Sequence, residues 1–225
     1  RLSDTNLWLA LLFLAFILIV GPTGFILTMG TESLGHMMSN MFSMITYTDP
    51  IDKTGFVQDW TVFYWAWWIA FAPFVGIFVT RISKGRTIRQ VLLGMSLLGS
   101  LGVWTFYIIF GNYALHLELT GALPVVDMVH DDAPAAIAAI IAHLPLGKVA
   151  LAIFVAVTTV FVATTYDSAS YTLASAATQA LHAGEDPARW HRLFWAGVLG
   201  LLPVGLMFIG GLKVVQSAVL LAGLP

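Results

Sequence analysis

Long stretches without a charged side chain dominate this 225-residue chain. A helix that crosses the hydrocarbon core of a bilayer needs about 20 apolar residues, and five stretches approach or exceed that length. They are 7–29, interrupted only by Gly21-Pro22, then 60–80, 90–117, 149–183, in which Asp167 is the only charge, and 193–212. A sixth stretch, 214–225, is too short to cross. The pattern predicts an all-α integral membrane protein, and we interpret the chain as part of a longer one.

The composition excludes several classes of protein. Hydrophobic residues make up 59% of the chain and charged residues 10%, against about 45–50% and 25% in soluble domains, so an ordinary cytosolic enzyme is excluded. The net charge of −2 argues against nucleic-acid binding, which requires an excess of positive charge. Cysteine is absent, and no phosphate loop, nucleophile elbow or paired-carboxylate site is present. The six histidines lack metal-ligand spacing, so we interpret them as structural or solvated, and we expect no enzyme.

The charged loops indicate how the chain is oriented. The loop 81–89 carries four basic residues and no acid, and the loop 184–192 carries Arg189 and Arg192 against Glu185 and Asp186. Basic loops face the cytoplasm in multi-pass proteins, whereas acidic residues here collect in the intervening loops. We therefore expect a multi-pass protein of a bacterial-type inner (plasma) membrane, with Arg1 on the cytoplasmic side.

Two segments between spans predict short surface helices on the outer face. Residues 31–47 mix polar side chains with methionines, and residues 133–144 are apolar but too short to cross a membrane. Asp131, Asp132 and then Pro134 form a helix-start signal before the second segment. Each helix has two possible roles: a lid over the outer face, or a solvated connector between spans.

The second long span carries a stripe of aromatic rings. At about 100° per residue, seven rings fall within an arc of roughly 120°: Trp60, Tyr64, Trp67, Trp68, Phe71, Phe74 and Phe78. Interfacial belts explain Trp and Tyr near helix ends, but not rings deeper in the span. Ring faces attract a quaternary ammonium ion by about 0.5–2 kcal/mol each. The stripe suits such a cation, and a packed aromatic helix face is the alternative.

The fourth span contains the one charge that lies clearly within a span, at Asp167. Such a carboxylate is costly unless it is hydrated or paired, and it is by default a functional candidate; it also fits a local helix cap or the cytoplasmic mouth. The neighbouring hydroxyls of Thr164 and Thr165 are hard oxygen ligands suited to Na⁺. Threonines in membrane helices also bond the carbonyl four residues earlier, which is the alternative for both.

Residues 60–78 and 81–89 together closely resemble the signature of the betaine/carnitine/choline transporter family. The resemblance rests on Trp-Ala-Trp-Trp at 65–68, Pro-Phe-Val-Gly at 73–76 and the basic loop, and it extends to Gly21-Pro22-Thr23 and Asp167-Ser168-Ala169-Ser170. It implies an inverted-repeat, LeuT-like secondary transporter, assembled as a homotrimer, of which this chain holds mainly the second repeat. Repeats of this kind bind substrate near the membrane midplane.

The resemblance also implies the site residues. By position, Trp67, Trp68 and Phe71 belong to an aromatic substrate box, although relatives have Trp or Tyr where Phe71 stands. The hydroxyls of Thr164 and Thr165 and the carbonyl of Phe161 correspond to half of a sodium site, and the other half of both sites lies in the first repeat.

The expected function is the import of a quaternary-ammonium osmolyte such as glycine betaine, choline or carnitine, by Na⁺-coupled symport and without another cofactor. A proton-coupled symporter or a substrate:product antiporter of the same family is the alternative. A membrane enzyme or a non-transporting subunit fits less well, since an enzyme needs clustered ionisable groups and a subunit needs no inward-facing tryptophans.

These interpretations divide the chain into ten segments. The transmembrane segments are 1–30, 60–80, 90–117, 148–183, 193–212 and the truncated 213–225; the outer segments are 31–59 and 118–147, and the cytoplasmic loops are 81–89 and 184–192.

Overall fold

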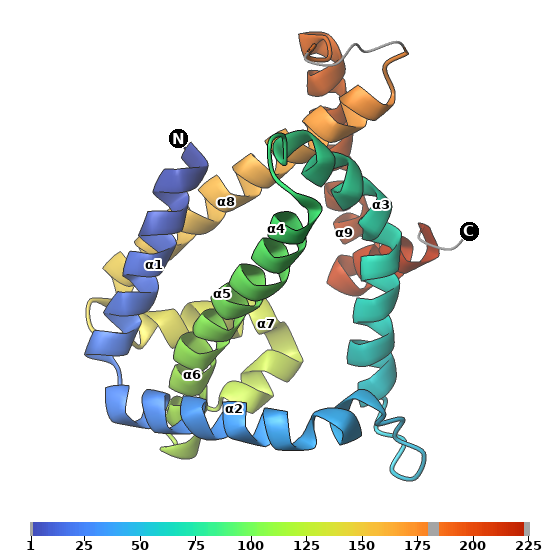
Figure 1. Cartoon of the computed structure of the whole chain (residues 1–225). Helices are drawn as coiled ribbons and strands as arrows, with labels where there is room; N and C mark the ends of the chain where they lie inside the picture. Colours follow the sequence, from blue (N-terminus) through green and yellow to red (C-terminus); the bar gives the residue numbers. More distant parts are fainter. Residues whose placement is uncertain (1, 180–184, 223–225) are drawn as a thin grey trace. The chain divides into compact units, whose positions relative to one another are not determined.

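The computed structural model describes residues 2–179 and 185–222, apart from the side chains of residues 81, 210–213, 219, 220 and 222. Within these residues the regular structure is entirely helical (Figure 1). The elements are α1 (Leu2–Val20), α2 (Thr23–Ile45), η1 (Val57–Val62), α3 (Phe63–Ile82), α4 (Ile88–Leu93), η2 (Gly94–Leu98), α5 (Gly99–Phe106), η3 (Tyr107–Gly111), α6 (Asn112–Leu119), α7 (Val125–Ala142), α8 (Gly147–Ala176) and α9 (Arg189–Ala222), where η denotes a π-helical turn.

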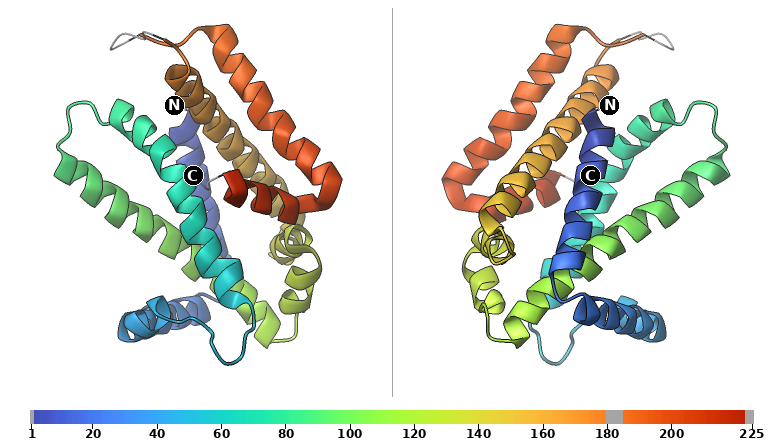
Figure 2. Two further views of the ribbon diagram at one scale, coloured as in Figure 1. Left: turned by 90° about the vertical axis from the view of Figure 1, so that its right-hand side faces the viewer. Right: turned by 90° about the vertical axis from the view of Figure 1, so that its left-hand side faces the viewer.

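Five helical stretches among the described residues are long and apolar enough to cross a membrane, as predicted. They are Leu2–Val20, Val57–Thr80, Ile88–Leu119, Gly147–Ala176 and Arg189–Ile209. The last predicted span and the partial one after it belong to one helix, α9, whose ribbon bends sharply in its C-terminal part (Figure 2).

The first helix ends earlier than expected, at Gly21-Pro22. Pro22 disfavours helical geometry at the residue before it, and the Gly21 amide donates to the Ile17 carbonyl over 2.8 Å. A Cβ on Gly21 would lie 2.7 Å from that carbonyl oxygen, so the close approach requires glycine. The chain then turns into α2, which crosses the end of α1 (Figure 1). Residues 23–29, expected in the first span, thus begin α2, and the boundary that we expected at residue 30 lies inside this helix.

The chain divides into two compact units, each described separately below. The first comprises Arg1–Met44 and Thr87–Val162, and the second comprises Ile45–Arg86 and Ala163–Pro225. The core of the first unit is built from α1, α2, η3, α6, α7 and the start of α8: Phe13, Leu14, Ile17, Ile26, Ile109, Tyr113, Leu117, Ile140, Ile141, Leu144 and Ala150. Gly30 on α2 allows close packing there, since a Cβ would lie 2.5 Å from the Ile108 side chain.

The second predicted outer segment, 133–144, lies in α7, which begins earlier, at Val125, and is kinked where we expected the helix to start. Asp132 leaves helical geometry (φ −152°, ψ 94°) and accepts the Ala135 amide over 3.1 Å, so it caps the helix segment that Pro134 opens. The residues beyond it, Ala136, Ile140 and Ile141, are buried. One face of this part of α7 therefore belongs to the core of the first unit.

The second unit opens with a compact loop held by a buried aspartate. Asp49 is 5% exposed, and one carboxylate oxygen accepts the Thr54 amide at 2.6 Å and the Thr54 hydroxyl at 2.7 Å. The Tyr47 hydroxyl donates to the other oxygen over 3.1 Å. The Thr54 hydroxyl is the main reason that the pKa of Asp49 is lowered, and the same carboxylate raises the pKa of Tyr47.

The basic loop after α3 forms a tight turn. Gly85 has a positive φ of 85°, which glycine adopts without steric cost. Thr87 and Gln90 then form a reciprocal capping box at the start of α4. Much of the 81–89 signature is therefore the chemistry of a turn followed by a helix start. In the second unit, α3 packs against α9.

Candidate functional site

The predicted aromatic stripe forms a continuous ladder of ring contacts along η1 and α3. Successive centroid distances are 6.2 Å for Trp60–Tyr64, 5.9 Å for Tyr64–Trp67, 6.5 Å for Trp67–Phe71 and 5.2 Å for Phe71–Phe74. Trp68 joins from the side, with its ring 6.0 Å from Trp67. The structure thus brings Trp67, Trp68 and Phe71 together, and Trp67 touches both of the others.

These rings pack on one another but are only partly covered by the described chain. Trp67 is 37% exposed, Phe71 39% and Trp68 56%, and the described side chains of η1 and α3 include no buried one. The faces of these rings are therefore available to a ligand or to a further segment of protein, so the substrate box and the packed aromatic helix face both stay open as interpretations.

The other three predicted residues share one face of α8. Phe161, Thr164 and Thr165 lie at positions i, i+3 and i+4 of this continuous helix, where side chains are neighbours. Two hydroxyls and a carbonyl are hard oxygen donors of the kind that small hard cations prefer. The donor set fits Na⁺, but three oxygens on one helix face leave the rest of a coordination shell to other segments.

Asp167, two residues beyond Thr165 on α8, forms an ion pair with α9. Its Oδ1 lies 2.9 Å from Nη2 of Arg192, and the Asp167 side chain is 71% exposed while that of Arg192 is 33% exposed. The pair neutralises the one acidic side chain of α8. Sequence reasoning assigned Arg192 to a cytoplasmic loop and missed this role, although it is one of two arginines at the start of the next apolar stretch.

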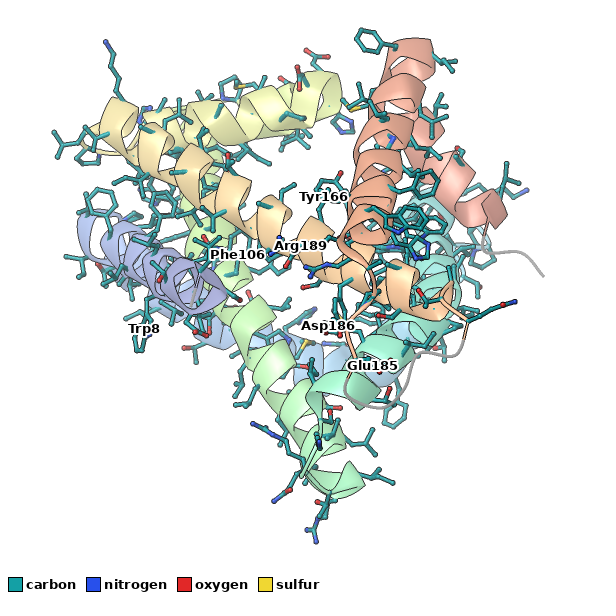
Figure 3. All side chains as sticks on the ribbon, turned by 90° about the horizontal axis from the view of Figure 1, so that it is seen from above. Trp8, Phe106, Tyr166, Glu185, Asp186 and Arg189 are labelled. Carbon is teal, nitrogen blue, oxygen red and sulfur yellow. The ribbon has the colours of Figure 1, made fainter. Side chains whose placement is uncertain are left out.

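Tyr171, one helical turn beyond Asp167 on α8, contacts the same arginine. The Arg192 Cζ atom lies 5.3 Å from the Tyr171 ring centroid, and the Tyr171 hydroxyl donates to Oδ1 of Asp186 over 2.8 Å. Figure 3 marks Tyr166 on α8, and Glu185, Asp186 and Arg189 where the chain enters α9. We call Asp167, Tyr171, Asp186 and Arg192 the α8–α9 joint.

The sequence profile of the betaine/carnitine/choline family of transporters matches residues 1–225. The chain belongs to this family. Two curated relatives are each 37% identical to it over its whole length: an uncharacterised transporter of Escherichia coli K12, YeaV, and a carnitine transporter of Acinetobacter baumannii. The match covers 100% of this chain but 47% of the first relative and 41% of the second. This betaine/carnitine/choline family chain therefore spans less than half the length of these relatives.

One histidine of this family chain has a defined structural role. Nε2 of His191 accepts from the Trp195 indole N–H over 3.1 Å, and its Nδ1 lies 3.2 Å from the Thr178 hydroxyl. His191 thus links the segment that follows α8 to α9. No group of three metal-ligating side chains occurs among the described residues.

Proposed function

We propose that the full-length protein is a secondary transporter that imports quaternary-ammonium osmolytes such as glycine betaine, choline or carnitine. The observation that carries this proposal is the exposed ladder of rings centred on Trp67, within a helix able to cross a membrane. A quaternary ammonium ion has no N–H to donate, so ring faces attract it without a second charge in the membrane. A relative named a carnitine transporter supports the same substrate class.

Trp67, Trp68 and Phe71 are proposed as this chain's share of the substrate site, by analogy with the family's aromatic box. The remaining rings would come from the first repeat of an inverted-repeat, LeuT-like fold, with substrate held between the repeats near the midplane. The same family resemblance supports a homotrimer in the bacterial inner membrane.

We further propose that transport is Na⁺ symport by alternating access. Thr164, Thr165 and the Phe161 carbonyl would form half of the sodium site, because the family resemblance assigns them this role and they lie at neighbouring positions of one helix, α8. Sodium bound there would stabilise the state that also binds substrate, and a sodium gradient would then drive accumulation.

The test is uptake by the full-length protein in proteoliposomes. Labelled glycine betaine, choline and carnitine are offered with an inward Na⁺ gradient, or with K⁺ in its place. We expect saturable uptake of at least one onium substrate that requires Na⁺. Uptake that follows a proton gradient, or that needs substrate inside the liposomes, would replace sodium symport with the alternative mechanisms. The absence of uptake of all three would overturn the substrate class.

A further inference from the structure

We propose that Arg192 is a positioning residue for sodium coupling. It holds the Asp167 carboxylate at the α8–α9 joint and so keeps a bare negative charge away from the face of Thr164 and Thr165. The inference rests on the sodium coupling proposed above.

The spacing along α8 puts the carboxylate within reach of the proposed ion site. Asp167 follows Thr164 by three residues, and side chains at that spacing are neighbours on a helix surface, with Cβ atoms about 5–6 Å apart. No other acidic side chain occurs in Gly147–Ala176. Asp167 is therefore the carboxylate of this helix that could turn toward an ion beside Thr164.

The contacts at the joint show which partner is fixed. Arg192 contacts two residues of α8. Its Nη2 lies 2.9 Å from Oδ1 of Asp167, and its Cζ lies 5.3 Å from the ring centroid of Tyr171. The hydroxyl of Tyr171 in turn donates a hydrogen bond to Oδ1 of Asp186. Arg192 is two-thirds covered, whereas Asp167 is 71% exposed. Without the arginine, the carboxylate would have open space in which to change its direction.

A free carboxylate beside the threonines would alter the ion site in a defined way. Carboxylate oxygens are strong ligands for hard cations, so an unpaired Asp167 would hold Na⁺ more tightly and release it more slowly. Transport requires release on the opposite side, and so the pairing with Arg192 favours turnover. The alternative is that the ion pair only fastens α8 to α9.

Four variants of the full-length protein separate these roles in proteoliposomes. The initial rate of labelled substrate uptake is measured against external Na⁺ for the wild type, Arg192→Gln, Asp167→Asn, the double variant and Tyr171→Phe. We expect R192Q to lower the half-saturating Na⁺ concentration by about two- to fivefold, the range of an exposed ion pair, and to lower the maximal rate. The double variant should return to the wild-type half-saturation, because the carboxylate is gone.

Two controls address the structural alternative. Tyr171→Phe removes the bond to Asp186 and weakens the joint, but it leaves Asp167 paired, so it should keep the wild-type half-saturation. Arg192→Lys keeps the charge and should do the same. If R192Q fails to reach the membrane, Arg192→Met provides a second neutral side chain of similar length.

The outcomes distinguish this inference from the function on which it rests. Sodium-dependent wild-type uptake with an unchanged half-saturation in R192Q would overturn only the role of Arg192. An equal shift of the half-saturating Na⁺ concentration in Y171F, or in the double variant, would also overturn it. The ion pair would then only stabilise the packing of α8 against α9. Wild-type onium uptake that ignores Na⁺ would overturn the sodium coupling and this role together, while the substrate class would stand.

Discussion

At the scale of single residues, Trp67 and Trp68 are not equivalent. Trp67 touches the rings of Phe63, Tyr64, Trp68 and Phe71, so its replacement disturbs the whole ladder. The described ring contacts of Trp68 are with Trp67 alone, and its ring is more exposed. Trp68 is therefore the cleaner position at which to remove one ring from the proposed substrate site.

Replacing Trp68 by Leu should weaken the binding of a trimethylammonium substrate by about two- to thirtyfold, the equivalent of one cation–π contact of 0.5–2 kcal/mol. Membrane insertion should be unchanged, since Leu is apolar. Equilibrium binding of labelled glycine betaine or carnitine to the purified full-length protein measures the effect. Trp65→Leu is the matched control, because residue 65 lies off the stripe. Equal affinity in W68L and the wild type would remove Trp68 from the site.

The Asp49 loop should depend on pH in a direction set by its hydrogen bonds. Bonds from Thr54 lower the pKa of Asp49 below its ordinary value of 3.8. The folded-state pKa is depressed, so the stabilisation is complete above the ordinary value and is lost as the pH falls through the lowered one.

Hydrogen exchange at the Thr54 amide measures this dependence, because that amide donates to Asp49. Protection, corrected for the intrinsic rate, should be constant near neutral pH and should fall in strongly acidic buffer. Asp49→Asn is the matched variant, since Asn also tolerates the positive φ of 52° at this position. It should be less protected than the wild type at neutral pH and should show no acid step. An acid step that persists in D49N would assign the titration to another group.

Much of the ladder was predictable from spacing, whereas its exposure and the joint were not. A fixed rotation per residue determines which rings of α3 share a face, so Trp60, Tyr64 and Trp67 could be grouped without coordinates. Exposure depends on which other segments cover that face. The partner of Asp167 lies 25 residues away on another helix. Local periodicity describes only neighbours along one helix, so it could not predict this contact.

At the scale of elements, α8 carries two pairs of adjacent threonines. Thr158 and Thr159 donate their hydroxyls to carbonyls earlier in their own helix, over 2.8 and 2.7 Å. The second pair, Thr164 and Thr165, is the one proposed to bind sodium. The two pairs provide a matched comparison within one helix.

The variant Thr164→Ala/Thr165→Ala should abolish the sodium dependence of uptake, because it removes two of the three proposed oxygen ligands. Thr158→Ala/Thr159→Ala removes the same atoms from the same helix and should leave the dependence intact. Uptake at varied external Na⁺ in proteoliposomes checks both. A normal sodium response in the first variant would place the coupling site elsewhere.

The start of the buried part of α7 depends on one cap. Asp132→Ala should lower the free energy of unfolding by about 0.5–2 kcal/mol, the usual cost of losing an N-cap side chain. Asp131→Ala removes the same charge from the adjacent position but spares the bond to Ala135, so its effect should be within about 0.5 kcal/mol. Denaturant unfolding in detergent micelles compares the two. Equal losses would indicate a charge effect instead of a cap.

The cap of α7 was predictable and its burial was not. Asp-Asp-Ala-Pro is a local signal, so residues 131–134 suffice to place a helix start. Whether Ile140 and Ile141 face water or a core depends on α1 and α6, which are distant in the sequence. At Gly21-Pro22 the break was visible, but composition alone did not determine that the chain changes direction there.

At the scale of the whole molecule, both proposed sites are incomplete in this chain. The ring ladder is partly exposed, and the proposed sodium site has three oxygens in this chain, so each proposed site would need residues from the rest of the full-length protein. The isolated 225-residue chain should therefore give no onium uptake above that of protein-free liposomes, whereas the full-length protein should give saturable uptake. Saturable uptake by the isolated chain would contradict the division of the sites between two repeats.

The stretch Ile88–Leu119 contains two π-helical turns, η2 and η3. Each π turn accommodates about one more residue than an α-helical turn, because its hydrogen bonds reach one residue further. A homologous span that lacked one of them would be one residue shorter between the same two ends, and an alignment would place a single-residue gap in the middle of a transmembrane helix. Such a gap would record the loss of a π turn, not a shortened span or a change of fold.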